Sequence, residues 1–365
     1  MRSFTRMPRV VFWVGVAALL GSPAIPAHAI TYELVPVGNP GNANDPATGG
    51  LYGGVAYDYQ IGKHEVTIQQ YTHFLNAVAT TDTYSLYNAS MATDLNVAGI
   101  SRSGTSGSYT YSVINNGGDS SYRPITYVSW FDAARFANWM ANGQPTGAQD
   151  STTTESGAYD LSGATSGDAP AKNVTNPNTG AAPASYIPTE NEWYKAAFYS
   201  PVLNSGSGGY WDYATQSNDE PGNTIGGMTN QSNTRAGGVF AVTQSSTYSA
   251  SQNYLTEVGA FRISFSAYGT FDQLGNVSEF TDTASLPNPH NPLAELKKRI
   301  GCGWECLADK LQGKLVEHVD PLHESATLGF RLAAPAAVPE PSTYAMALAG
   351  LACGGFSMWR RRKRA

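Results

Sequence analysis

The sequence predicts an α+β domain with few helices and much irregular loop. Only three segments begin with a helix-capping pattern, and long stretches rich in Gly, Ser, Thr and Asn separate them. Charged residues make up only 14% of the 365-residue chain, whereas hydrophobic residues make up 41%, enough for a substantial core. We see no internal repeat and no clean linker, so a single loop-rich domain is expected between two distinctive ends.

The N-terminal residues 1–29 have the pattern of a signal peptide. A basic stretch ends at Arg9, an apolar run covers residues 10–20, and Ala27-His28-Ala29 provides a small-x-small cleavage site. We therefore expect signal peptidase to cleave the chain and the mature protein to begin near Ile30.

Two strands are expected at the start of the mature chain. Residues 30–54 are predicted to form an N-terminal strand, over Thr31–Val37, and a Gly/Asn-rich loop. Residues 55–61 then alternate between apolar and polar side chains, which is typical of a half-buried strand.

Three helices follow, each with its own N-cap. Thr67 precedes a run with apolar residues on one helical face, namely Ile68, Tyr71, Phe74, Leu75 and Val78. Ser129 and Asp132 resemble a capping box for a helix that continues to Met140 and closes at Gly143, and Thr189 with Glu192 forms a full box for a helix over Trp193–Tyr199, stopped by Pro201. Three tryptophans fall on these helices and are expected in the core: Trp130, Trp139 and Trp193. The sequence assigns no chemistry to His64 or His73.

The C-terminal residues 338–365 contain Val338-Pro339-Glu340-Pro341-Ser342-Thr343, an apolar stretch over 344–359 and five consecutive cations. This order predicts a short transmembrane helix with its basic end on the cytoplasmic side. The segment resembles the PEP-CTERM sorting signal of Gram-negative bacteria. The resemblance implies transient anchoring in the inner membrane, processing by an exosortase, and release to the cell surface or extracellular matrix.

Removal of both ends leaves an acidic body. Three N-terminal arginines, five C-terminal cations and Glu340 go, which leaves 14 basic residues against 27 acidic ones and a net charge of about −13. Nucleic acid is therefore not expected as a partner. Cys353 leaves with the tail, so Cys302 and Cys306 are the only cysteines that remain.

Five motifs in the body occur in the order of one family. They are Gly62-Lys63-His64-Glu65-Val66-Thr67, Arg123-Pro124-Ile125-Thr126-Tyr127-Val128-Ser129-Trp130, Ile187-Pro188-Thr189-Glu190-Asn191-Glu192-Trp193, Gly275-Asn276-Val277-Ser278-Glu279-Phe280-Thr281 and Leu328-Gly329-Phe330-Arg331. Over residues 55–334 the chain resembles the formylglycine-generating enzyme, or sulfatase-modifying factor, family. The resemblance implies a single domain of modified C-type-lectin-like fold. Family members include a copper- and oxygen-dependent oxidase of a sulfatase cysteine, together with relatives that lack this chemistry.

The cysteine segment matches the family's catalytic pattern only in part. Copper(I) prefers soft thiolates, and the oxidase of this family holds the metal with two of them. Cys306 stands at the first catalytic position and is the catalytic candidate if the protein is an oxidase, but Leu311 stands where the second cysteine belongs. Cys302 is out of place for that pattern, so the oxidase interpretation depends on Cys302 acting from the other side.

Other interpretations of the two cysteines remain open. They could form a disulfide, which exported chains favour, or stay as ordinary thiols. A zinc site with His318 and His323 is a further alternative, although its spacing is one residue short of the usual interval and Pro321 interrupts the helix that would carry both histidines. The surrounding segment 296–315 is unusually rich in cations, which fits either genuine divergence or a reading-frame error.

Calcium is expected at the Gly-Asn-Val-x-Glu turn. The family resemblance implies that Asn276, Val277 and Glu279 hold a structural calcium through oxygen atoms, the hard ligands that calcium needs. Asn233 occupies the approximate place of a second calcium loop. The alternative is that these side chains form turn and core hydrogen bonds. We therefore expect an exported, non-catalytic binding or structural module with extracellular polysaccharide as a candidate partner, and the copper oxidase is the alternative.

Overall fold

The computed structural model of the protein describes residues 29–288, 291–309 and 316–337, apart from the side chains of 286–295. The predicted sorting segment, Leu311 and nearly all of the predicted signal peptide lie outside these residues. No helix in the described part of the chain has the length and apolar character needed to cross a membrane.

Two sheets form the framework of the domain. The first has three antiparallel strands in the order β1 (Leu34–Val37), β2 (Tyr59–Gly62) and β13 (Ala333–Pro335). The second has the order β11 (Val316–Val319), β10 (Asn291–Ile300), β9 (Ser278–Asn288) and β12 (Leu328–Gly329), and β12 runs parallel to β9. Pairing of β2 with both β1 and β13 joins the start of the described body to its end.

Three short hairpins complete the strands. They are β3 (Ile100–Ser103) with β4 (Thr110–Val113), β5 (Tyr199–Ser200) with β6 (Gly209–Tyr210), and β7 (Arg235–Ala236) with β8 (Val239–Phe240). The predicted strand over 55–61 is correct only in its second half, since pairing begins at Tyr59. Residues 55–58 precede the paired segment, and the Val55 carbonyl instead accepts the Gly41 N–H in a loop hydrogen bond.

The three long helices begin at the predicted caps. They are α1 (Ile68–Val78), α3 (Trp130–Ala141) and α4 (Glu190–Phe198). Each N-cap hydroxyl accepts an N–H from the third helical residue, whose side chain bonds back to the cap. The helix predicted to reach Tyr199 ends at Phe198, because Tyr199 begins β5. Two four-residue helices, α2 (Ser90–Thr93) and α5 (Leu203–Gly206), and the 3₁₀ turn η1 (Pro46–Thr48) were not predicted.

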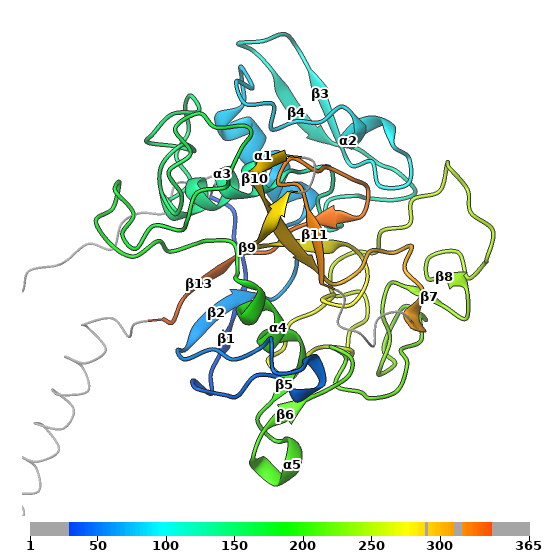
Figure 1. Ribbon diagram of the computed structural model, residues 1–365. Coiled ribbons are helices and arrows are strands. Elements are labelled where there is room, and N and C mark those ends of the chain that lie inside the picture. Colours follow the sequence, from blue (N-terminus) through cyan, green and yellow to red (C-terminus); the bar gives the residue numbers. More distant parts are fainter. Residues whose placement is uncertain (1–28, 289–290, 310–315, 338–365) are drawn as a thin grey trace, which may run out of the picture. The chain divides into compact units, whose positions relative to one another are not determined.

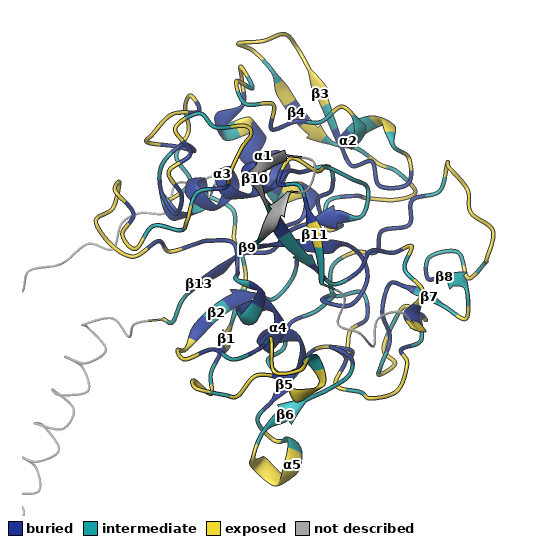
Figure 2. Ribbon diagram, in the orientation of Figure 1, coloured by how far each residue is buried: buried dark blue, intermediate teal, exposed yellow. Residues whose placement is uncertain are grey.

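The core lies where the helices meet the sheets. Helix α4 contacts both β2 and β9, and α1 packs against α3 through Phe74 and Phe136. The three predicted core residues Trp130, Trp139 and Trp193 are fully buried. Figure 2 shows α3 and α4 largely buried, whereas α5 and many outer loops are exposed. The described part is thus a single α+β domain with few helices and much loop, as predicted.

Candidate functional site

Cys302 and Cys306 lie in the turn that follows β10. Gly301 adopts a φ of +80°, and a Cβ atom there would come within 3.3 Å of the Trp193 ring. A Cβ at Gly303 would lie 2.7 Å from the Cβ of Thr327. Glycine at both positions therefore lets the turn pack directly against the core.

The two cysteines form a disulfide. Their Cα atoms are 6.0 Å apart, within the usual range for such a bond, and the Cys306 N–H donates to the Gly303 carbonyl to close the turn. Cys302 is 4% exposed and packs in a cluster with Trp193 and Ile300. Among the alternatives that the sequence left open, the structure contains the disulfide.

The disulfide does not fit a copper(I) centre. Copper(I) needs thiolates, and both sulfur atoms are joined to each other. Cys306 is also fixed through its backbone, because its carbonyl accepts the Arg235 N–H at 2.7 Å. The catalytic candidate is therefore held in a structural turn.

The two histidines of the zinc alternative do not join the cysteines. His318 lies on β11, and its Nδ1 contacts the Ser285 hydroxyl. Within the described residues, no group of three or more His, Cys, Asp or Glu side chains is placed to hold a metal ion. The spacing that suggested a zinc site therefore separates His318, on strand β11, from the two cysteines in the turn after β10.

Trp304 anchors the cysteine turn to a stack of aromatic rings. Its ring lies parallel to that of Tyr254, with centroids 4.7 Å apart, and Tyr254 stacks in turn on Tyr248 at 5.9 Å. Phe240 packs beside both Tyr254 and Trp304. Tyr248 is 56% exposed and Trp304 only 4%, so the stack runs from the surface to the turn.

Asn276 and Asn233 come together, but through hydrogen bonds. The Asn276 side-chain oxygen accepts the Asn233 amide at 2.9 Å and the Thr256 N–H at 3.2 Å. The backbone carbonyl of Asn233 accepts the Asn276 N–H, and that of Asn276 accepts the Trp304 N–H. The side chain of Val277 packs with Trp304 in the core. Three oxygen atoms at this turn thus accept N–H groups: the Asn276 side-chain oxygen and the backbone carbonyls of Asn233 and Asn276.

Glu279 has different partners from these asparagines. Its carboxylate is fully buried and accepts N–H groups from the Arg331 guanidinium, at 2.6 Å from both Nε and Nη2, and from the Trp193 indole at 2.7 Å. Burial alone would lower the pKa of Arg331, but the Glu279 charge more than offsets this and raises it. Calcium binding by Asn276, Val277, Glu279 and Asn233 stays a prediction.

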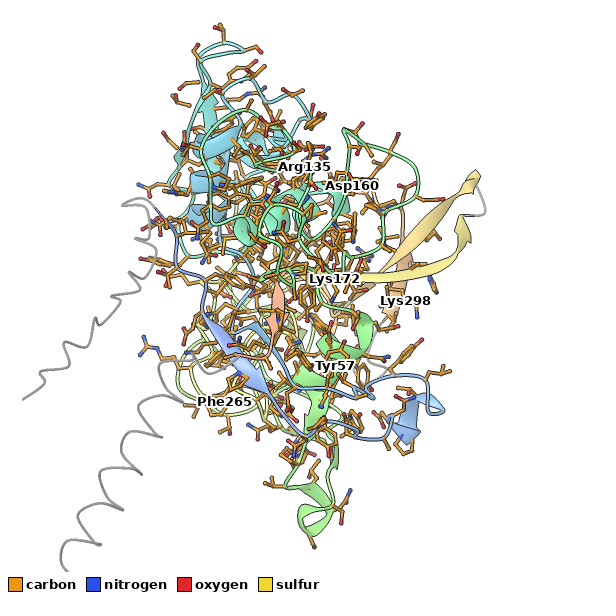
Figure 3. All side chains as sticks on the ribbon, turned by 90° about the vertical axis from the view of Figure 1, so that its left-hand side faces the viewer. Tyr57, Arg135, Asp160, Lys172, Phe265 and Lys298 are labelled. Carbon is orange, nitrogen blue, oxygen red and sulfur yellow. A yellow bond between two sulfur atoms is a disulfide. The ribbon has the colours of Figure 1, made fainter. Side chains whose placement is uncertain are left out.

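The cation-rich strand β10 has acidic partners. Lys297 lies 3.5 Å from the Asp282 carboxylate, and Lys298, labelled in Figure 3, bonds to Glu190 at 2.7 Å. Arg299 pairs with Glu317. The three cations at positions 297–299 therefore each have an acidic partner.

The sequence did not predict the cavities, because each is lined by segments that are distant in the chain. A polar one of about 750 Å³ lies between residues 39–47 and the β5–β6 hairpin. A smaller one of about 240 Å³ is lined by Tyr57, Lys172 and Tyr186, among others, and another of about 270 Å³ includes Arg135 and Asp132. The sequence signal for the first of these cavities was the density of Asn and Gly after β1.

Comparison with protein families gives two matches. The model described as the sulfatase-modifying factor enzyme 1-like domain matches residues 54–336, and the PEP-CTERM protein-sorting motif matches residues 337–363. The sorting motif indicates an exported protein sorted to the cell surface. Comparison with curated proteins gives no significant match.

Several solved structures resemble the chain at low sequence identity. CarF is 19% identical over 85% of this chain and 100% of its own, with a TM-score of 0.46. PvdO from Pseudomonas aeruginosa is 17% identical over 77% and 81%, with a TM-score of 0.39. Treponema denticola variable protein 1 is 16% identical over 86% and 97%, with a TM-score of 0.46. We rest the assignment on the family match, which spans most of the sequence: the chain belongs to the sulfatase-modifying factor enzyme 1-like family.

Proposed function

We propose that the protein is a non-catalytic binding module, exported to the cell surface or extracellular matrix of a Gram-negative bacterium. The Cys302–Cys306 disulfide carries this proposal, because it removes the thiolate of the sole cysteine at a family catalytic position. The sequence gives further support, since Leu311 stands where the second catalytic cysteine belongs.

The surroundings of the disulfide support a structural role for the turn. Cys302 is buried against Trp193 and Ile300, and Trp304 is held beneath Tyr254. A nucleophilic or metal-binding cysteine instead needs an accessible, partly polar environment that lowers the thiol pKa. The turn therefore stabilises the domain, and its exposed loops are left to bind a ligand.

The oxidase is the alternative, and it makes an opposite prediction. Mature protein is incubated with copper(I), oxygen and a cysteine-containing sulfatase-type peptide, and the peptide mass is followed. We expect no mass change, with a known formylglycine-generating oxidase as the positive control. Formation of the aldehyde product by the isolated protein would overturn the non-catalytic proposal.

For the ligand we propose an extracellular polysaccharide. The acidic body makes nucleic acid an unfavourable partner, whereas a matrix protein meets polysaccharide throughout its surroundings. Retention of the purified protein on the polysaccharide of the producing cells tests this directly. Absence of retention, with correctly folded protein, would remove the polysaccharide from the proposal.

A further inference from the structure

A cavity of about 750 Å³ lies between two segments far apart in the chain. Residues 39–47 form one wall, and Tyr199, Asn204 and residues 207–210 form the other. The loop that carries η1 lies beside the β5–β6 hairpin in both views (Figures 1 and 3). Its volume of about 750 Å³ is within the range of pockets that enclose small organic ligands.

Hydrogen bonds hold the first wall in place. Asn42 donates its side-chain amide to the Gly53 carbonyl at 2.8 Å and to the Tyr210 hydroxyl at 2.7 Å. Tyr210 donates in turn to the Ala43 carbonyl at 2.7 Å. Asn44 accepts the Gly54 N–H at 2.7 Å. The cavity is therefore preformed, so a ligand would not have to order the loop on binding.

The opposite wall depends on two glycines. Gly208 has a φ of +80°, and a Cβ atom there would overlap the Tyr199 hydroxyl. A Cβ at Gly209 would lie 2.6 Å from the Asn204 side-chain amide. Because Gly208 and Gly209 have no side chains, the Tyr199 hydroxyl and the Asn204 amide can lie against the backbone of this wall.

The lining is polar but almost uncharged. Its side chains include four asparagines and a serine, and it contains no Lys, Arg or His. Asp45 is the only acid, and its carboxylate already accepts the Ala47 N–H at 2.9 Å and the Tyr194 hydroxyl at 2.7 Å. An anionic ligand would therefore find no cation in the lining, and the one carboxylate is already hydrogen-bonded, whereas amides and hydroxyls match a neutral ligand rich in hydroxyl groups.

Two features of the lining remain available to such a ligand. Asn204 uses its amide nitrogen on the Gly208 carbonyl, but within the described residues no hydrogen bond uses its side-chain oxygen or the Ser207 hydroxyl. Both residues are exposed. Tyr199 and Tyr210 meet edge to face with centroids 5.1 Å apart, and aromatic rings offer apolar faces for the C–H groups of a sugar.

From this lining we propose that the cavity is a binding site for a neutral oligosaccharide, the part of the polysaccharide that the protein recognises. This inference rests on the proposed binding function and gives it a location and a ligand class. Tyr210, which is half-buried, contributes the ring surface with Tyr199 packed behind it, and Asn204 and Ser207 contribute hydrogen bonds at the rim.

The test uses the mature chain, calorimetric titration, and neutral trisaccharides of glucose, galactose and mannose as probes, with trigalacturonate as the anionic contrast. We expect at least one neutral trisaccharide to bind. Asn204→Ala should weaken that binding by about five- to tenfold, the effect of one lost hydrogen bond. Ala47→Trp, which places an indole in the cavity, should abolish it. Val202→Trp is the matched control, because Val202 is 75% exposed near the cavity but does not line it.

Each result decides between the two proposals. If no neutral trisaccharide binds, or if trigalacturonate alone binds, the cavity assignment is wrong. If the protein is retained on the producer's polysaccharide and Ala47→Trp leaves that retention unchanged, the binding function survives but its site lies elsewhere. If the folded wild type shows no retention although a trisaccharide binds in the cavity, the cavity assignment survives and the polysaccharide proposal fails.

Discussion

Replacement of Glu279 by Gln separates a purely structural ion pair from the calcium prediction. The carboxylate and the Arg331 guanidinium are both fully buried and lie 2.6 Å apart, and the Trp193 indole donates to the same carboxylate. Loss of the negative charge leaves Arg331 charged in the core. Loss of one partner from a buried ion pair typically costs about 3–5 kcal/mol.

This cost converts to a measurable change in melting temperature. Unfolding entropy is about 2.1 cal/mol/K per residue, so a domain of about 280 residues gives about 0.6 kcal/mol/K. We therefore expect Glu279→Gln to lower the Tm by about 5–8 °C. Glu305→Gln, at an exposed site, should change the unfolding free energy by less than about 0.5 kcal/mol.

The assay is calorimetric unfolding in excess EDTA and again in excess calcium. If Glu279 serves only the ion pair, the loss is the same in both buffers, since no metal contributes to it. Glu279→Gln combined with Arg331→Met should then be less destabilised than the sum of the two single variants. Destabilisation seen only in calcium would identify Glu279 as a calcium ligand and refute the purely structural ion pair.

Three further predictions concern the fold. Burial, with the Arg331 and Lys63 charges, lowers the pKa of His64 to about 4 from 6.5, so the folded state loses stability as the pH falls from about 6.5 to about 4. In urea titrations at pH 7 and pH 4.5, His64→Gln should lose less stability than the wild type over this interval, by about 2 kcal/mol after allowance for the partial exposure of His64. Cys302→Ser should cost about 2 kcal/mol, the loop-entropy value for a five-residue loop, and an undiminished urea midpoint would contradict this. Thr189→Ala removes the cap of α4 and should cost about 1 kcal/mol in the same assay, whereas an unchanged midpoint would show that the cap contributes little.

Short-range patterns in the sequence were the most informative about the fold. The caps Thr67, Ser129 and Thr189 were predicted correctly because each acts on a backbone N–H only three residues away. The predicted strand over 55–61 was wrong in its first half. Its alternation is a local property, whereas its pairing depends on distant strands, including β13 at the other end of the body.

The hydrogen bonds at the site that the sequence did not predict join residues far apart in the chain. The sequence did not predict the ion pair of Glu279, because its partner Arg331 is 52 positions away. Asn276 likewise bonds to Asn233, 43 positions earlier. The asparagines near the N-terminus looked like an ordinary loop, because the hairpin that completes the cavity follows more than 150 residues later.

The state of Cys302 and Cys306 tests the non-catalytic proposal most directly. The mature protein is isolated from the envelope of the producing cells, denatured, and titrated for thiols before and after reduction, with copper(I) binding measured on the native protein in parallel. We predict no free thiol before reduction, two after it, and no stoichiometric copper(I) on the unreduced protein. Two free thiols together with one tightly bound copper(I) per chain would contradict the non-catalytic proposal and restore the oxidase.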